Sequence, residues 1–208
     1  MTDPFLKATA YITALGWSFC LAVICLSHPI VLVLYGNQWN DAVDLTRLLA
    51  AAMIFNVAVT LCRVALLSSG EVTEIVRLTV LVALQSVALA AIGASLGLMA
   101  LGVTTVIAAA LRAALWLRAT STHLGVPLPG LLRTFGLSAM VALVSAVGPL
   151  VALFSFGPYP ESFLCPLLIG GFGGVAGFVF AVVFFRHPLR IEILSFWTKL
   201  NGLTRDAK

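Results

Sequence analysis

Charged side chains are scarce in this sequence. Only 10% of its 208 residues are Asp, Glu, Lys or Arg, whereas 61% are hydrophobic. A soluble globular domain carries about 25% charged and about 45–50% apolar residues. A soluble fold of this length would therefore have too few polar groups to cover its surface, and hydrocarbon is the solvent that removes this difficulty. The composition predicts an integral membrane protein.

The sequence also lacks the side-chain groupings that membrane enzymes bring together. All eight acidic residues lie at the ends of apolar segments or in loops, and the three histidines lie on three different segments. No HExxH pattern is present, and the four cysteines show no CxxC or Cys/His spacing. We therefore expect no catalytic residues, no metal and no cofactor, and we interpret the cysteines as small packing residues.

Long apolar blocks account for most of the chain. About 20 mostly apolar residues in a helix cross roughly 30 Å of hydrocarbon. Because the blocks are apolar on all sides and do not alternate with a period of two, they favour helices over the strands of a membrane barrel. Six such blocks occur: Thr13–Tyr35, Leu45–Leu67, Ile75–Gly93, Leu98–Leu117, Leu131–Phe154 and Phe163–Phe185.

The fold class expected from these blocks is an all-α integral membrane bundle of about six transmembrane helices in residues 1–186. Residues 187–208 form a second, cytoplasmic unit in this prediction. Its apolar residues recur at helical spacing, which is typical of an amphipathic helix that lies on the membrane surface. Those residues are Ile193, Phe196, Trp197, Leu200 and Leu203.

The positions of lysine and arginine predict the orientation. If the N-terminus is cytoplasmic, nine of the 12 cations lie on the inner side: Lys7, Arg77, Arg118, Arg133, Arg186, Arg190, Lys199, Arg205 and Lys208. Only Arg47 lies in an outer loop, three residues after Asp44, a spacing that favours a local ion pair. The positive-inside rule thus predicts that both termini are cytoplasmic. Because the cations are spread over separate loops, membrane lipid is an expected partner and nucleic acid is not.

Two arginines, Arg63 and Arg112, lie within the apolar blocks. A charged side chain at the centre of a span costs at least about 2.5–3.5 kcal/mol on insertion scales, so it usually faces protein or water. One interpretation is that both face an aqueous cavity and hold an anionic head group, because guanidinium matches phosphate geometry. The other is that each reaches the inner interface, about 8–12 Å away along the helix. The absence of an acid in either span favours the cavity slightly, and both interpretations remain open.

Glycines recur at GxxxG spacing in the last block. The pairs are Gly170 with Gly174 and Gly173 with Gly177. No Lys-Ser/Thr follows them, as a phosphate-binding loop would require. The spacing instead favours close packing between two helix backbones.

Three prolines also lie within the blocks, and a proline inside a helix removes a hydrogen bond and bends the axis. We therefore expect kinks at Pro29, Pro149 and Pro166. Neutral polar residues form a further group inside the spans, and their spacing does not distinguish hydrogen bonding between helices from the lining of a polar path. They are Asn56, Thr60, Gln85 and Ser86.

The segment Pro29–Val43 reads PIVLVLYGNQWNDAV. It resembles a stretch of bacterial polysaccharide and O-antigen flippases, in which a proline-containing span ends in a (Phe/Tyr)-Gly-x-x-(Trp/Tyr)-x-x-Ala turn on the outer side. The next block runs through Leu48-Leu49-Ala50 to the small-residue turn Ser68-Ser69-Gly70, and the hairpin loop Leu96–Val103 is also similar to that family. The likeness covers roughly residues 10–133.

This resemblance implies the multidrug/oligosaccharidyl-lipid/polysaccharide exporter superfamily. Its members consist of two helical bundles around a cationic cavity, and they move a polyprenyl-diphosphate-linked glycan outward by alternating access. Arg63 and Arg112 are then expected to contact the diphosphate, in the cytoplasmic (inner) membrane of a bacterium. The chain corresponds to the later half only, so a second helical half or a homo-oligomer is implied. Glu71 departs from the family, which is often basic at that position. The alternative is a non-transporting membrane subunit or scaffold for cell-envelope polysaccharide biosynthesis.

Overall fold

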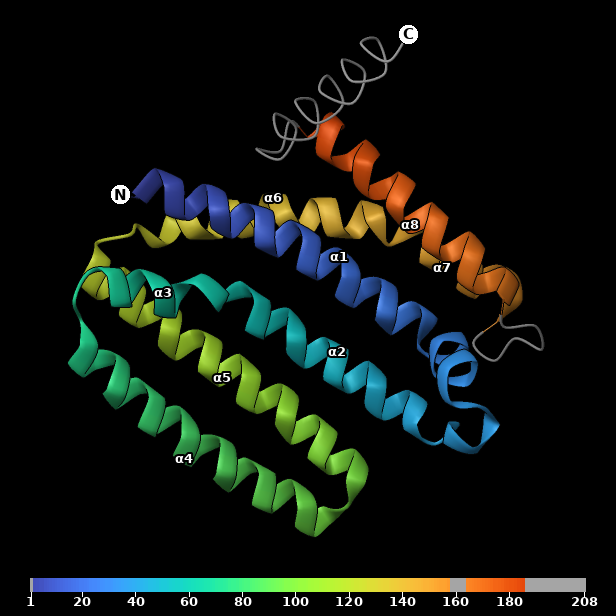
Figure 1. The fold of residues 1–208 in the computed structure, drawn as a ribbon, viewed down its shortest axis with the longest axis horizontal. Helices are drawn as coiled ribbons and strands as arrows, with labels where there is room; N and C mark the ends of the chain where they lie inside the picture. Colours follow the sequence, from blue (N-terminus) through green and yellow to red (C-terminus); the bar gives the residue numbers. More distant parts are fainter. Residues whose placement is uncertain (1, 158–163, 186–208) are drawn as a thin grey trace, which may run out of the picture.

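A computed structural model describes residues 2–157 and 164–185 (Figure 1). These residues form helices and connecting turns, with no strand among them. The predicted amphipathic unit at 187–208 lies outside the described residues. The elements are α1 (Thr2–Tyr35), the 3-10 helix η1 (Asn37–Trp39), α2 (Ala42–Ala58), α3 (Thr60–Ser68), α4 (Val72–Leu96), α5 (Leu98–Leu124), α6 (Leu128–Ser145), α7 (Val147–Phe156) and α8 (Leu164–Phe184).

Six helical segments in the described part of the chain are long and apolar enough to cross a membrane. Two of them consist of paired helices, because α2 is followed directly by α3 and α6 directly by α7. The predicted all-α membrane class is therefore confirmed, and the chain is a multi-pass membrane protein. The helices extend beyond the predicted apolar blocks. For example, α5 continues to Leu124, whereas the fourth block ends at Leu117.

Helices α4, α5, α2 and α1 lie side by side in a row (Figure 1). In this row α4 packs on α5, α5 on α2 and α2 on α1, whereas α1 also packs on α6, α7 and α8, which contact one another. The central position of α1 and the edge position of α4 are reflected in burial. In the apolar part of each span, 44% of residues are buried for α1, but only 11% for α4.

Glycines lie at three of the contacts in this row. A Cβ added at Gly16 of α1 would lie 2.6 Å from Cγ1 of Val57 in α2. At Gly102 of α5 it would lie 2.7 Å from Cδ1 of Leu48 in α2, and at Gly93 of α4 it would lie 2.7 Å from the Cα of a residue in α5. Since lipid supplies no hydrophobic force between helices, close approach at small residues is what lets these pairs gain van der Waals contact.

Polar side chains connect α1 to two of its neighbours, α6 and α2. The Oγ1 of Thr13 lies 2.8 Å from the Oγ of Ser138 in α6, and both residues are fully buried. On the other side, the indole Nε1 of Trp17 donates to the carbonyl of Ile54 in α2 over 2.8 Å. These bonds add specificity to contacts that are otherwise made by small apolar groups.

At two of the three prolines, the helix is interrupted three residues before the proline. Leu26 has non-helical φ/ψ angles before Pro29 in α1, and Ala146 separates α6 from α7 before Pro149. Pro166 lies in the first described turn of α8, and the positions three and four residues before it lie outside the described residues.

The GxxxG residues of α8 lie on the face that packs against α1, α6 and α7. A Cβ at Gly173 or Gly177 would lie 2.9 Å from a backbone atom of the neighbouring segment, whereas a Cβ at Gly171 would meet nothing within 4 Å. The nearest neighbours of an added Cβ are Leu26 for Gly170, Gly148 for Gly173, Pro149 for Gly174 and Val144 for Gly177. The side chain of Ser145 also donates to the Gly174 carbonyl over 3.0 Å.

Replacement of Gly173 by leucine is expected to separate α8 from α7. The added side chain meets the Gly148 backbone, which cannot rotate aside, so we expect a loss of about 1–3 kcal/mol in unfolding free energy. Gly171→Leu in the same helix is the matched control and should change the unfolding free energy by less than about 0.5 kcal/mol. Unfolding in mixed detergent, followed by circular dichroism, measures both variants. Equal losses would contradict packing at Gly173.

Candidate functional site

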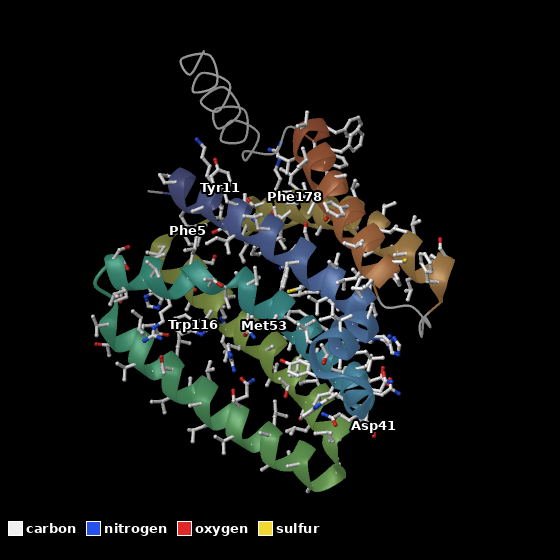
Figure 2. The ribbon with its side chains drawn as sticks, turned by 45° about the vertical axis from the view of Figure 1, so that its right-hand side comes forward. Phe5, Tyr11, Asp41, Met53, Trp116 and Phe178 are labelled. Carbon is white, nitrogen blue, oxygen red and sulfur yellow. The ribbon has the colours of Figure 1, made fainter. Side chains whose placement is uncertain are left out.

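The guanidinium of Arg112 lies between three helices. Arg112 is near the middle of α5, and its Nη1 donates to Oδ1 of Asn56 in α2 over 3.2 Å. Its Nη2 donates to Oγ of Ser86 in α4, also over 3.2 Å. One arginine therefore bridges the two helices that flank α5. Figure 2 labels Met53 on α2 and Trp116 on α5, which lie one helical turn from Asn56 and Arg112.

Both partners of Arg112 are neutral. Within the described residues no carboxylate forms an ion pair with it, and its Nε is buried without a hydrogen-bond partner. A guanidinium has five N–H donors, so two bonds leave much of its capacity unused. The positive charge is not neutralised locally, although the residue is half-buried inside a membrane span. An arrangement of this kind favours the binding of an anion.

A cavity of about 230 Å³ adjoins the guanidinium. Asn56 of α2, Ser86 of α4, and Thr104 and Thr105 of α5 supply its polar lining, and alanines supply most of the remainder. Pockets that enclose a whole drug-sized ligand are typically about 300–1,000 Å³. This cavity is smaller, and it suits the head group of a larger molecule.

The neutral polar residues have separate roles around this site. Asn56 and Ser86 line the cavity and accept hydrogen bonds from Arg112, whereas Nε2 of Gln85 donates to the Ala108 carbonyl and links α4 to α5. Thr60 donates from Oγ1 to the carbonyl of Asn56 in its own span. Hydrogen bonding between helices and the lining of a polar space, which spacing left as alternatives, thus both occur.

The break that ends α2 was not predicted from the sequence. Val59 has φ −111° and ψ 6°, although residues 42–68 contain no proline and no glycine. The Val59 N–H and the Thr60 hydroxyl both donate to the Asn56 carbonyl, over 3.2 and 3.1 Å. A Thr side chain that bonds back to the residue four positions earlier is the one available signal, because such bonds often bend helices. The break places Asn56 in the last turn of α2.

Arg63 does not share this site. It is exposed on α3, does not line the cavity, and forms no hydrogen bond or ion pair within the parts of the chain that the structure describes. Arg63 and Arg112 looked equivalent in the sequence, since each lies about two turns from the inner end of an apolar block. Only Arg112 is held between helices by polar partners.

No protein-family model, curated protein or solved structure matches this chain. What it does is therefore inferred from its own residues and their arrangement.

Charged clusters lie at both ends of the layer of helices. At the outer end in the predicted orientation, Arg47 pairs with Asp44 over 2.7 Å, as their spacing predicted, and its Nε donates to the Ser27 hydroxyl. At the other end the ring nitrogens of His123 lie 3.7 Å from Glu71 and 3.9 Å from Glu74. Among the described residues, no three His, Cys, Asp or Glu side chains are placed to hold one metal ion.

One short pattern in the chain matches a catalytic motif by letters alone. Gly93-Ala94-Ser95-Leu96-Gly97 fits GxSxG, whose serine acts as a nucleophile on a sharp strand-to-helix turn. Here Ser95 lies in the last turn of helix α4, and its hydroxyl donates to the Ile92 carbonyl over 2.8 Å. The structural context that the motif requires is missing at this position.

Replacement of Arg112 by methionine is expected to leave the unfolding free energy nearly unchanged, because removal of a buried, unpaired charge offsets the loss of its two hydrogen bonds to neutral groups. Leu131→Ala, at a fully buried position in α6, is the reference for a packing defect and should lower it by about 2–5 kcal/mol. The detergent unfolding assay measures both. A large loss in Arg112→Met would show that Arg112 holds the helices together and is not reserved for a ligand.

Proposed function

We propose that this chain is one helical half of a flippase-type transporter. In this proposal it translocates lipid-linked oligosaccharide or polysaccharide precursors across the bacterial cytoplasmic membrane by alternating access. The observation that carries the proposal is the guanidinium of Arg112, held inside a membrane span by two neutral acceptors beside a cavity. Its charge is available to an anionic head group, and its planar geometry matches the oxygens of a phosphate.

The surroundings of Arg112 favour an amphiphile over a free anion. The cavity has room for a head group only, and the helices around it present apolar surfaces to the hydrocarbon. Exposed leucine and valine side chains lie along α4, including Leu84 and Val87, which are close to Ser86 in the sequence. A polyprenyl diphosphate combines a phosphate head with a hydrocarbon tail. In this proposal the head lies at the polar cavity and the tail lies in the hydrocarbon.

The row formed by α4, α5, α2 and α1 supports the proposal that the chain is half of a transporter. Arg112 lies between α2 and α4, and α4 at the edge of the row has few buried residues in its apolar part. A single row supplies one wall of a translocation path. The opposite wall is proposed to come from a second helical half or from a second copy of this chain.

The proposed orientation has the N-terminus in the cytoplasm. Phe5 and Asp41, labelled in Figure 2, lie at opposite ends of the layer of helices. Lys7, near Phe5, is on the side that the positive-inside rule assigns to the cytoplasm, and Arg47, near Asp41, is on the other. The resembling segment ends at this outer side: α1 stops at Tyr35, Gly36 has φ +85°, and η1 follows.

Binding of a short-chain lipid diphosphate tests the site directly. In purified protein in nanodiscs, Arg112→Gln is expected to weaken binding of farnesyl diphosphate by about 10–100-fold, since hydrogen bonds to charged groups contribute about 1.5–3 kcal/mol. Arg112→Lys should bind with intermediate affinity because it keeps the charge but loses the paired geometry. Inorganic pyrophosphate should bind more weakly than the prenylated form.

Arg118→Gln is the matched control, since Arg118 is exposed on the same helix. It should bind farnesyl diphosphate as the parent chain does. Equal weakening in Arg118→Gln and Arg112→Gln would mean that only the net charge of α5 matters, and unchanged binding in Arg112→Gln would remove the proposed head-group site.

Complementation tests the activity. A bacterial strain that lacks its O-antigen flippase is expected to regain surface polysaccharide when this chain is expressed with a partner half, and the Arg112→Gln variant should not restore it. The chain expressed alone distinguishes a self-assembling half, which restores export, from one that needs a different partner. Absence of export in both settings would contradict transport and favour the non-transporting subunit.

A further inference from the structure

Asn56 takes part in two structures at once. Its side-chain Oδ1 accepts the hydrogen bond from Arg112, and its main-chain carbonyl accepts from the Val59 N–H and the Thr60 hydroxyl. The residue that holds the guanidinium is therefore also the residue on which the break between α2 and α3 is built. Asn56 therefore connects the candidate site to the bend in the second span.

The break at Val59 differs from those near Pro29 and Pro149. A proline lacks the N–H that would close the helix, so a break at that residue is fixed by covalent structure. The second span has neither proline nor glycine, so every residue around Val59 is able to adopt helical geometry. Hydrogen bonds to the Asn56 carbonyl and packing hold this break.

The two sides of the break share two neighbours and differ in a third. Both α2 and α3 contact α1 and α5, and α3 also contacts α4. Cys62 and Leu66 of α3 are buried in one cluster with Ile75 of α4 and Trp116 of α5. A change of angle at Val59 would therefore move α3, and with it the start of α4, relative to α2.

We propose that occupation of Arg112 by an anionic head group releases Asn56 and changes the angle between α2 and α3. This inference rests on the proposed function. Phosphate oxygens accept hydrogen bonds from guanidinium more strongly than a neutral amide does, so a head group that binds both Nη atoms displaces Asn56 Oδ1 and Ser86 Oγ from them. Asn56 is thereby a positioning residue that links binding at the cavity to the bend.

Distances between pairs of spin labels at exposed positions measure the angle between α2 and α3. The pair Leu67→Cys in α3 and Leu132→Cys in α6 reports movement of α3, and the pair Met53→Cys and Leu132→Cys reports α2 as a reference. The four native cysteines are replaced beforehand, and the resulting chain is required to bind farnesyl diphosphate as the parent does. With saturating farnesyl diphosphate, the 67–132 distance should change by more than about 2 Å, a shift larger than most helix adjustments at interfaces, and the 53–132 distance should not.

Asn56→Ala and Ser86→Ala form a matched pair of variants, because each removes one of the two acceptors of Arg112 and only Asn56 lies at the break. Each variant is expected to bind farnesyl diphosphate up to about tenfold more tightly, since one internal competitor is gone. Ser86→Ala should keep the change in the 67–132 distance, and Asn56→Ala should lose it. A purely structural role for Asn56 predicts weaker binding in Asn56→Ala.

The outcomes separate this inference from the proposed function. Binding that depends on Arg112 without any change in the 67–132 distance overturns the coupling and leaves the head-group site intact. An equal distance change in Asn56→Ala and in the parent also overturns it. If Arg112→Gln binds farnesyl diphosphate as well as the parent does, the head-group site fails and the coupling fails with it.

Discussion

Helices surrounded by hydrocarbon have no hydrophobic force to bring them together, so each contact in this protein depends on how closely two backbones approach. Gly16, Gly93 and Gly102 supply that approach along the row from α1 to α4, and Gly148 with Gly173 supplies it between α7 and α8. The α1–α6 contact uses buried hydroxyls in addition to small residues. The resulting arrangement is a row from α4 to α1 that continues into the mutually packed group of α1, α6, α7 and α8.

A charge in the interior of such a layer needs a separate explanation. Neutral partners satisfy two of the five donors of Arg112, and no acid pairs with it in the described part of the chain. Ala108 and Ala109, about one turn before Arg112 on α5, are buried and line the same cavity. Ionisable groups within membrane spans usually mark functional sites.

The sequence was sufficient for the membrane class and for the approximate position of every span, since a run of about 20 apolar residues has few other uses. It was insufficient at the ends, because α5 continues through the polar residues after Leu117, where side chains can leave the hydrocarbon. It also left Arg63 and Arg112 equivalent. Their difference depends on which helix lies beside which, and hydropathy carries no information about the order α4, α5, α2. The break at Val59 was not predicted because it depends on hydrogen bonds to Asn56 and not on a proline or glycine.

The position of Arg112 along its helix is the last point that favours transport over simple anchoring of a lipid. Within the apolar part of α5, Leu98–Leu117, it lies 14 residues from one end and five from the other, or roughly 21 and 8 Å at about 1.5 Å per residue. A site that only anchors a head group would lie at one interface, where water already solvates phosphate. Inside the apolar part of a span an isolated anion and an isolated guanidinium each carry a desolvation penalty of several kcal/mol, and their pairing lowers both penalties. A cation at this depth would therefore lower the cost of moving a phosphate into the hydrocarbon, which is a step that the proposed translocation requires.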